Sequence, residues 1–146
     1  MQTRTTSRIF VAEPPQRFIA KPPIVVDCSV LAAVLFDEPE RDDALEHLAG
    51  RSLHAPTLLD FELANVAVNK SHVGPSDSAE LGIADYAELD IALHACPPDA
   101  LVGLALEYRL TAYDAAYLWL AGHLHAPLAT FDRKLGEAAR KHLAGL

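Results

Sequence analysis

Short apolar runs of strand length alternate with longer helical segments along this chain, and the alternation restricts the folds that it can adopt. The run IVVDC (24–28) is rich in β-branched residues and follows two prolines, which predicts a buried strand. Similar runs at 52–55, 89–96 and 126–131 are predicted to be further strands. Strands that alternate with helices favour a parallel sheet covered on both faces. We therefore predict an α/β fold with one domain and a short, mostly parallel sheet of about four to five strands.

Helical segments are predicted in the intervals between these strands. Their expected ranges are 29–36, a second segment that ends near 49, 57–72, a segment from the caps Ser76 and Asp77 to about Glu88, 100–109, 112–125 and a last helix from 132. The segment 57–72 is apolar on most of its faces, which predicts a buried helix whose few polar side chains meet polar groups inside the fold.

The chain divides into a basic arm and an acidic body. Its 146 residues are enough for one ordinary globular domain and too few to expect two. Residues 1–23 hold four of the ten prolines and a net charge of +3, so we interpret them as an arm that precedes a domain at 24–146. With a total charge of −8, that domain carries −11. Such a body should repel nucleic acid unless cations or basic patches intervene, and it should attract basic protein partners.

The sequence contains no clear targeting or membrane signal. Its opening residues lack the apolar core of a signal peptide. A membrane span needs roughly 20 predominantly apolar residues, and the longest candidate, 110–131, is broken by an acid, a glycine and a proline. The two cysteines, Cys28 and Cys96, do not imply a disulfide framework. We expect a cytoplasmic protein that does not cross a membrane.

Two acidic residues directly follow the apolar parts of predicted strands. Asp27 lies near the end of the run 24–28, and Asp132 follows the run 126–131, two residues after Thr130. In open α/β sheets the ligand site lies outside the carboxyl ends of the strands, so both acids are candidates for a functional site. Each also has a simpler interpretation, because an acid at the start of a helix can be its N-cap.

A third acid, Glu62, lies on the apolar helix predicted at 57–72. At about 100° per residue, Glu62 shares one narrow arc of that helix with Asn65 and Asn69. If the helix is buried, this polar stripe must meet something polar inside the fold. The alternative is a stripe that faces solvent.

The fourth acid, Asp114, is the only formal charge in LTAYDAAYLWLAGHLHAPLATF (110–131). Thr111 and Asp114 fit the capping-box pattern. Capping contributes about 0.5 to 2 kcal/mol, whereas an unpaired buried ion costs several kcal/mol. We therefore expect a carboxylate held in the interior for a cation or hydrogen-bond partner, with the capping role still open. Its expected neighbours are Tyr113, Tyr117, Leu118 and Trp119.

Four converging carboxylates would need a counter-charge. Like charges close together repel one another and raise their pKa values unless a divalent cation lies among them. A site with oxygen ligands alone suits Mg²⁺ or Mn²⁺. Other chemistries have weaker signals, because the sequence contains no H-E-x-x-H, no Gly-rich phosphate loop and no G-x-S-x-G. Cys28 has no histidine or basic neighbour in sequence to activate its thiol, which favours a small core residue.

Three sequence blocks carry a more specific pattern: IVVDCSVLAAVLFDEPE, APTLLDFELANV and LTAYDAAYLWLAGHLHAPLATFDRKL. They lie in this order between residues 24 and 137, and the third holds a Leu-Thr-x-Tyr-Asp-Ala-Ala-Tyr core with a second Asp eighteen residues on. Together they resemble the PIN domain family, particularly the VapC-type ribonuclease toxins of bacterial toxin–antitoxin pairs. Cys28, in place of a small or hydroxyl residue, and the arm at 1–23 depart from the usual pattern.

The resemblance implies a metal-dependent endoribonuclease that hydrolyses RNA phosphodiester bonds. Position by position, the family's metal-binding acids match Asp27, Glu62, Asp114 and Asp132, and its supporting polar residues match Thr130 and Asn65. One or two Mg²⁺ or Mn²⁺ ions would be the cofactor. Arg133 and Lys134 are candidate RNA contacts, or simply a solvated helix face. The implied partners are an RNA substrate, a cognate antitoxin protein and a second copy of the chain in a homodimer.

Two other functions remain open from the sequence. A PIN-like binding or regulatory module could keep the acids as a metal or partner site with little or no nuclease activity. An α/β protein of another kind could use the same acids only as helix caps and solvated charges, and its four carboxylates would then lie far apart.

Overall fold

A four-stranded parallel sheet forms the centre of the computed structural model, which describes residues 21–146. The predicted arm therefore lies almost entirely outside the described residues. The strand order is β3-β2-β1-β4, and every pairing is parallel. The strands are β1 (Pro23–Val26), β2 (Ser52–Pro56), β3 (Ile91–His94) and β4 (Leu128–Ala129). The predicted α/β class and parallel sheet are confirmed, with four strands.

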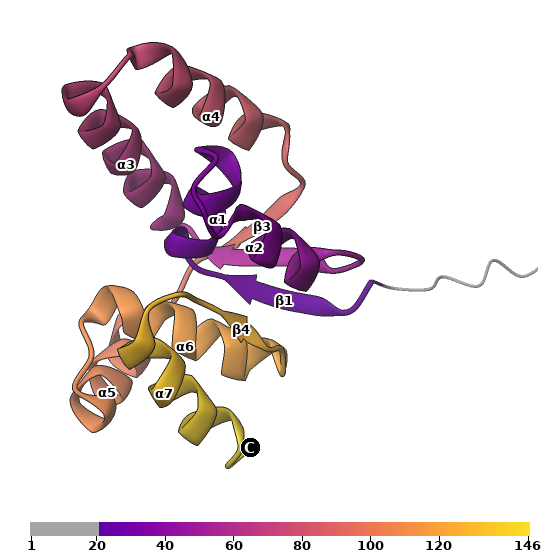
Figure 1. The fold of residues 1–146 in the computed structure, drawn as a ribbon. Coiled ribbons are helices and arrows are strands. Elements are labelled where there is room, and N and C mark those ends of the chain that lie inside the picture. Colours follow the sequence, from indigo (N-terminus) through magenta and orange to yellow (C-terminus); the bar gives the residue numbers. More distant parts are fainter. Residues whose placement is uncertain (1–20) are drawn as a thin grey trace, which may run out of the picture.

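Helices connect the strands and cover both faces of the sheet (Figure 1). They are α1 (Cys28–Leu35), α2 (Arg41–Leu48), α3 (Leu59–Val73), α4 (Ser76–Glu88), α5 (Pro98–Tyr108), α6 (Ala112–Leu124) and α7 (Arg133–Leu143). Each predicted helix is present with small shifts at its ends. Strands β3 and β4 are shorter than predicted. β3 pairs with β2 over Ile91–His94 only, and β4 pairs with β1 through only two residues before the chain turns into α7.

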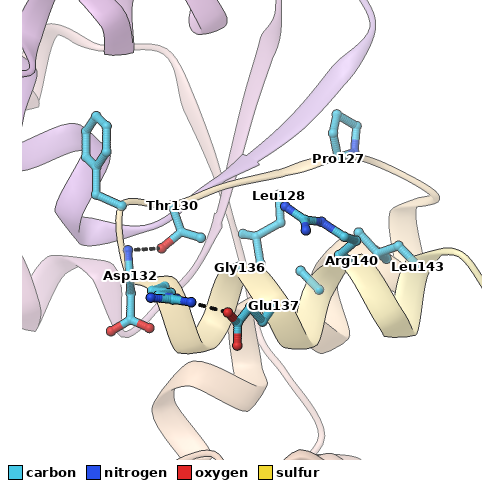
Figure 2. Close-up of a pocket in the computed structure, with 11 residues that line it drawn as sticks. Pro127, Leu128, Thr130, Asp132, Gly136, Glu137, Arg140 and Leu143 are labelled. Carbon is cyan, nitrogen blue, oxygen red and sulfur yellow. Dashed lines mark hydrogen bonds and ion pairs between the residues drawn. The ribbon is translucent and has the colours of Figure 1, made fainter.

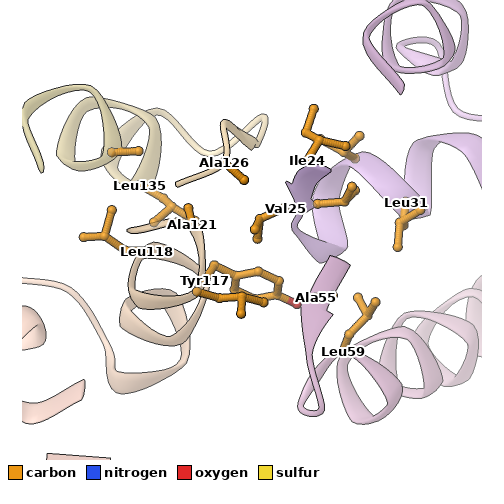
Figure 3. Close-up of a cluster of buried hydrophobic side chains, with 14 of the residues drawn as sticks. Ile24, Val25, Leu31, Ala55, Leu59, Tyr117, Leu118, Ala121, Ala126 and Leu135 are labelled. Atoms are coloured by element: carbon orange, nitrogen blue, oxygen red, sulfur yellow. The ribbon is translucent and has the colours of Figure 1, made fainter. Parts of the chain in front are cut away.

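The core lies between the sheet and the helices on either side of it. Val25 and Val26 of β1 point to opposite faces and are both fully buried, as expected for the central part of a parallel sheet. Figure 3 shows Tyr117 and Leu118 of α6 gathered with Leu135 of α7 on one side of β1. Burial of these side chains anchors α6 against the sheet.

Helix α3 is far more exposed than its apolar sequence predicts. Only Leu59 and Leu63 are buried, whereas Phe61 is 78% exposed and Val68 is also exposed. The reason is visible in Figure 1, where α3 and α4 form a hairpin that extends beyond the sheet, so most of α3 has no layer above it. The prediction of a buried helix was wrong, because an apolar sequence shows what a helix could bury but not whether a partner covers it.

Gly82 allows α4 to approach the end of α1. A Cβ atom at this position would collide with the ring of Phe36 and with the carbonyl of Leu35. Close packing at this point holds the base of the α3–α4 hairpin against the domain. None of the helices in residues 21–146 combines the length and apolar character needed to cross a bilayer.

Candidate active site

Asp27 is the most enclosed of the four predicted acids. It follows β1, is 6% exposed and caps α1, with its Oδ1 accepting hydrogen bonds from the Val30 N–H at 3.2 Å and the Ser29 hydroxyl at 2.6 Å. Its Oδ2 accepts a bond from the Thr130 hydroxyl. Burial raises the pKa of Asp27, although the bonds from Ser29 and Thr130 act in the opposite direction. The predicted capping role is confirmed, and the carboxylate is held in one orientation.

Two hydroxyls tie the end of β1 to the turn between β4 and α7. The Ser29 Oγ accepts the Phe131 N–H at 3.0 Å, and the Thr130 Oγ1 accepts the Asp132 N–H at 2.9 Å, as Figure 2 shows for the second bond. Each hydroxyl also donates to Asp27, so both strand ends share one network. The sequence interpretation found Thr130 but missed Ser29. The sequence does contain a pattern that could have indicated Ser29, because a hydroxyl residue lies two positions from an acid both in Asp27-x-Ser29 and in Thr130-x-Asp132.

Asp132 begins α7 as its N-cap and remains exposed. Its Oδ1 accepts the Leu135 N–H at 2.7 Å, which leaves its other oxygen free of intramolecular bonds among the described residues. The capping role predicted for this acid is therefore confirmed. Capping also fixes the carboxylate beside the network of Asp27 and Thr130.

Glu62 lies in the first turn of α3 and receives a hydrogen bond from a buried tyrosine. The Tyr117 hydroxyl donates to its Oε1 at 2.6 Å, and Tyr117 itself is 2% exposed. Burial is the main cause that raises the pKa of Glu62, and the charges of Asp27 and Asp114 raise it further. Tyr117 was not predicted as a site residue, although it lies one turn after Asp114 on the same helix.

Asp114 lies in the first turn of α6 and is only partly buried. Its N–H donates to the Thr111 Oγ1 at 3.1 Å, so Thr111 caps the helix as predicted. We expected an interior carboxylate, but Asp114 is only partly buried, and Tyr113 beside it is 68% exposed. This end of α6 is therefore open to solvent. Burial still raises the pKa of Asp114, and so do the charges of Asp132 and Asp27, while Lys134 lowers it.

The four acids form one electrostatic cluster. Asp27 and Asp114 both raise the pKa of Glu62, and Asp27 and Asp132 both raise that of Asp114. They come from the ends of β1 and β4 and the first turns of α3 and α6, so the fold brings together residues 105 positions apart. These effects argue against the alternative in which the four carboxylates lie far apart.

The oxygen-only donor set of this cluster fits a divalent cation, but the cluster is open. Like-charged carboxylates with raised pKa values are stabilised when a cation lies among them. Within residues 21–146, however, no three carboxylate, imidazole or thiol side chains are drawn together into a ready coordination shell. Mg²⁺ keeps several waters and is usually bound through only one or two carboxylates, so its binding does not require such a shell.

The remaining predicted residues lie around the cluster. Asn65 is exposed on α3 and lines a cavity together with Glu62. Arg133 is highly exposed, and its Nε contacts the Glu137 Oε1 at 3.0 Å, so it forms an ion pair with an acid of its own helix. Lys134 faces the cluster closely enough to lower the pKa of Asp114. Roles for these residues in binding RNA stay predictions.

Cys28 is unsuited to act as a nucleophile here. Burial raises the pKa of its thiol to about 12, and the charges of Glu62 and Asp27 contribute to the shift. Almost no thiolate would exist at neutral pH. The interpretation of Cys28 as a packing residue therefore agrees with the structure, in which it packs against the core.

Comparison with known proteins places these residues in a family context. The PIN domain family model matches residues 24–141, a range that contains all four acids. Ribonuclease VapC3 of Pyrobaculum aerophilum is 33% identical over 122 residues, which cover 78% of this chain and 92% of that protein. Ribonuclease VapC9 of Mycobacterium tuberculosis is 30% identical over 122 residues, which cover 80% and 91%. The crystal structure of PAE2754 from Pyrobaculum aerophilum superposes with a TM-score of 0.63 at 25% identity, covering 86% of this chain and 98% of that one.

Proposed function

The chain belongs to the PIN domain family, and we propose that it is an endoribonuclease, the toxin of a toxin–antitoxin pair. The proposal is carried by one observation: within the matched range, the charges of Asp27 and Asp114 raise the pKa of Glu62, and those of Asp132 and Asp27 raise the pKa of Asp114. Relatives at about 30% identity over most of their length are named ribonucleases, which supports RNA as the substrate. The reaction is hydrolysis of a phosphodiester bond.

Asp27, Glu62, Asp114 and Asp132 would hold Mg²⁺ or Mn²⁺ in this proposal. When bound, such an ion would lower the pKa of a water molecule and stabilise negative charge on the phosphate. The carboxylates hold the ion and orient water, and none acts as a covalent nucleophile.

Hydrogen bonds preorganise these carboxylates. Ser29 and Thr130 restrict the rotation of the Asp27 side chain, and Tyr117 restrains Glu62. We assign these three hydroxyl residues a positioning role, because each donates a hydrogen bond to one of the acids. Fixed orientation matters because a rigid set of charges needs little reorganisation during the reaction.

RNA must approach an acidic protein, and local cations reduce the repulsion. Lys134 already lowers the pKa of Asp114, so it lies where a phosphate would gain from a positive charge. Arg133 is exposed and could turn from Glu137 toward RNA. The net charge of −11 on residues 24–146 also favours fast association with a basic or amphipathic antitoxin segment. We propose this partner, a homodimer and a cytoplasmic location with the toxin function.

A second function, a binding or regulatory module with little nuclease activity, is favoured by one observation. The acids do not form a ready coordination shell in residues 21–146. A family member of this kind would bind Mn²⁺ or RNA through the same cluster without cutting RNA.

Cleavage of a panel of labelled RNAs separates the two functions. We expect the full chain to cut at least one RNA in Mg²⁺ or Mn²⁺, and EDTA to stop the cleavage. Binding of Mn²⁺ and RNA without cutting would favour the binding module. If Mn²⁺ showed no saturable binding, the assignment of the acid cluster as a metal site would be wrong.

A further inference from the structure

Two aromatic side chains are exposed next to the acid cluster. Phe61 and Tyr113 are 78% and 68% exposed, and they directly precede Glu62 and Asp114 in sequence. A phenylalanine so open to solvent is unusual, because rings of this size are mostly buried. Here the aromatic groups lie beside two of the proposed metal-binding acids and on two different helices, α3 and α6.

The two rings line one cavity. It has a volume of about 370 Å³ and is lined by Leu58, Phe61, Glu62, Asn65 and Tyr113. This volume falls in the ~300–1,000 Å³ range of small-molecule sites. Most of the lining is apolar, and the amide of Asn65 adds one donor group and one acceptor group. Glu62 lines this cavity and is also a member of the acid cluster, so the cavity adjoins the cluster.

The charge around the cavity disfavours a ligand held through phosphate alone. No lysine or arginine is among the described residues that line it, and the body of the chain is acidic. Aromatic stacking does not depend on net charge, and every nucleobase has a π-face. Of the parts of an RNA chain, the base is therefore the part that this surface is suited to bind.

We propose that Phe61 and Tyr113 form a stacking platform for one unpaired nucleobase, adjacent to the phosphodiester at the acid cluster. The inference rests on the proposed ribonuclease function and narrows its substrate class to single-stranded loops, bulges and ends. In a helix of paired RNA the faces of a base are covered by its neighbours, so only an unstacked base can lie on these rings.

Other exposed apolar residues do not share this arrangement. Val68 and Val73 of α3 and Leu81 of α4 are exposed, but they do not line the cavity of Phe61 and Tyr113. Phe131 is 41% exposed and also precedes an acid of the cluster, Asp132, but it does not line this cavity. A protein partner on the α3–α4 hairpin would bury Val68, Val73 and Leu81, whereas Phe61 and Tyr113 line a cavity together with Glu62, one of the proposed metal-binding acids.

Binding of a fluorescent RNA tests the platform directly. The probe is a short single-stranded oligonucleotide with one 2-aminopurine, mixed with the full chain in Ca²⁺ without Mg²⁺ or Mn²⁺ to slow cleavage. We expect saturable quenching of the probe as its base stacks on a ring. Phe61→Ala and Tyr113→Ala should each weaken binding about tenfold, a typical effect for one base–aromatic stack.

Matched variants separate stacking from apolar bulk. Tyr113→Phe keeps a ring and should bind like the wild type, whereas Phe61→Leu keeps apolar volume and should be as weak as Phe61→Ala. Leu106→Ala removes an exposed apolar side chain of α5 outside the cavity and should have no effect. The fluorescence of the single tryptophan, Trp119, reports whether each variant is folded.

Several results would overturn the platform. One is that the wild type does not quench the probe. Another is that the alanine variants bind the probe as tightly as the wild type does. A third is that the wild type binds an oligonucleotide that lacks the base at the probe position as tightly as the intact probe. If Phe61→Ala changed only the oligomeric state by light scattering, the rings would be a contact between protein chains instead. Cleavage is measured separately. Ring-dependent quenching without cleavage would support the stacking platform and contradict the ribonuclease function. Cleavage that is the same in both alanine variants would support the ribonuclease function and contradict the platform.

Discussion

Asp27 and Asp114 belong to one acid cluster but are held in opposite ways. Asp27 is almost fully enclosed and accepts hydrogen bonds from a backbone N–H and two hydroxyls. Asp114 lies at an open end of α6, where Thr111 rather than its own carboxylate caps the helix N–H group. The difference indicates that Asp27 supports both the fold and the site, whereas the fold depends little on the charge of Asp114.

The largest expected effect is the loss of activity in Asp114→Asn. Removing this charge should lower RNA cleavage by on the order of 10² to 10³-fold, the usual cost of losing one preorganised charged group. The melting temperature should stay the same or rise, because a partly buried charge among like charges is removed. Initial cleavage rates and thermal unfolding measure the two effects.

Asp85→Asn is the control for Asp114→Asn, since Asp85 is exposed on α4 away from the cluster. It should leave cleavage and unfolding unchanged. Normal cleavage by Asp114→Asn would contradict the role of this acid, and strong destabilisation would contradict the contrast with Asp27.

Asp27→Ala should lower both activity and stability. The substitution removes the cap of α1 and leaves the hydroxyls of Ser29 and Thr130 without their acceptor. We expect a loss of about 1 to 3 kcal/mol in the free energy of unfolding, together with loss of cleavage. Urea unfolding measures the change. A variant as stable as Asp114→Asn would remove the distinction between the two acids.

Tyr117→Phe tests an intermediate case, because Tyr117 supports Glu62 through one hydrogen bond. That bond lowers the pKa of Glu62, so its loss should raise the pKa further above the ordinary 4.5. The acid limb of the pH–rate profile should then move to higher pH. We also expect about 1 kcal/mol less stability at neutral pH.

The raised pKa of Glu62 also determines how the stability difference between the wild type and Tyr117→Phe changes with pH. Burial holds the pKa of folded Glu62 above its unfolded value, so its ionised form disfavours the fold, and protonation removes that effect as the pH falls. The charge-assisted bond from Tyr117 is lost on the same protonation. The stability difference between wild type and variant should therefore shrink at acidic pH. Tyr86→Phe, which loses a bond to Asp60 on α3, should leave the acid limb in place.

Local sequence patterns were sufficient to predict the order of the elements and to choose the four acids as candidates. Strand length, β-branched composition and turn residues are properties of a few neighbouring residues, and so is the capping position of Asp27 and Asp132. The acids at strand ends could be chosen because parallel strands end at the same edge of a sheet. These features required no knowledge of which elements pack together.

Tertiary packing alone decided which acid each supporting hydroxyl contacts and which apolar surfaces stay uncovered. Thr130 reaches Asp27 across 103 positions and Tyr117 reaches Glu62 across 55, and helical or strand periodicity carries no information at such separations. The exposure of Phe61 has the same origin, since α3 extends beyond the sheet that would have covered it. Periodicity describes what one element can bury, but burial needs a second element at the right place, and only the folded chain supplies that element.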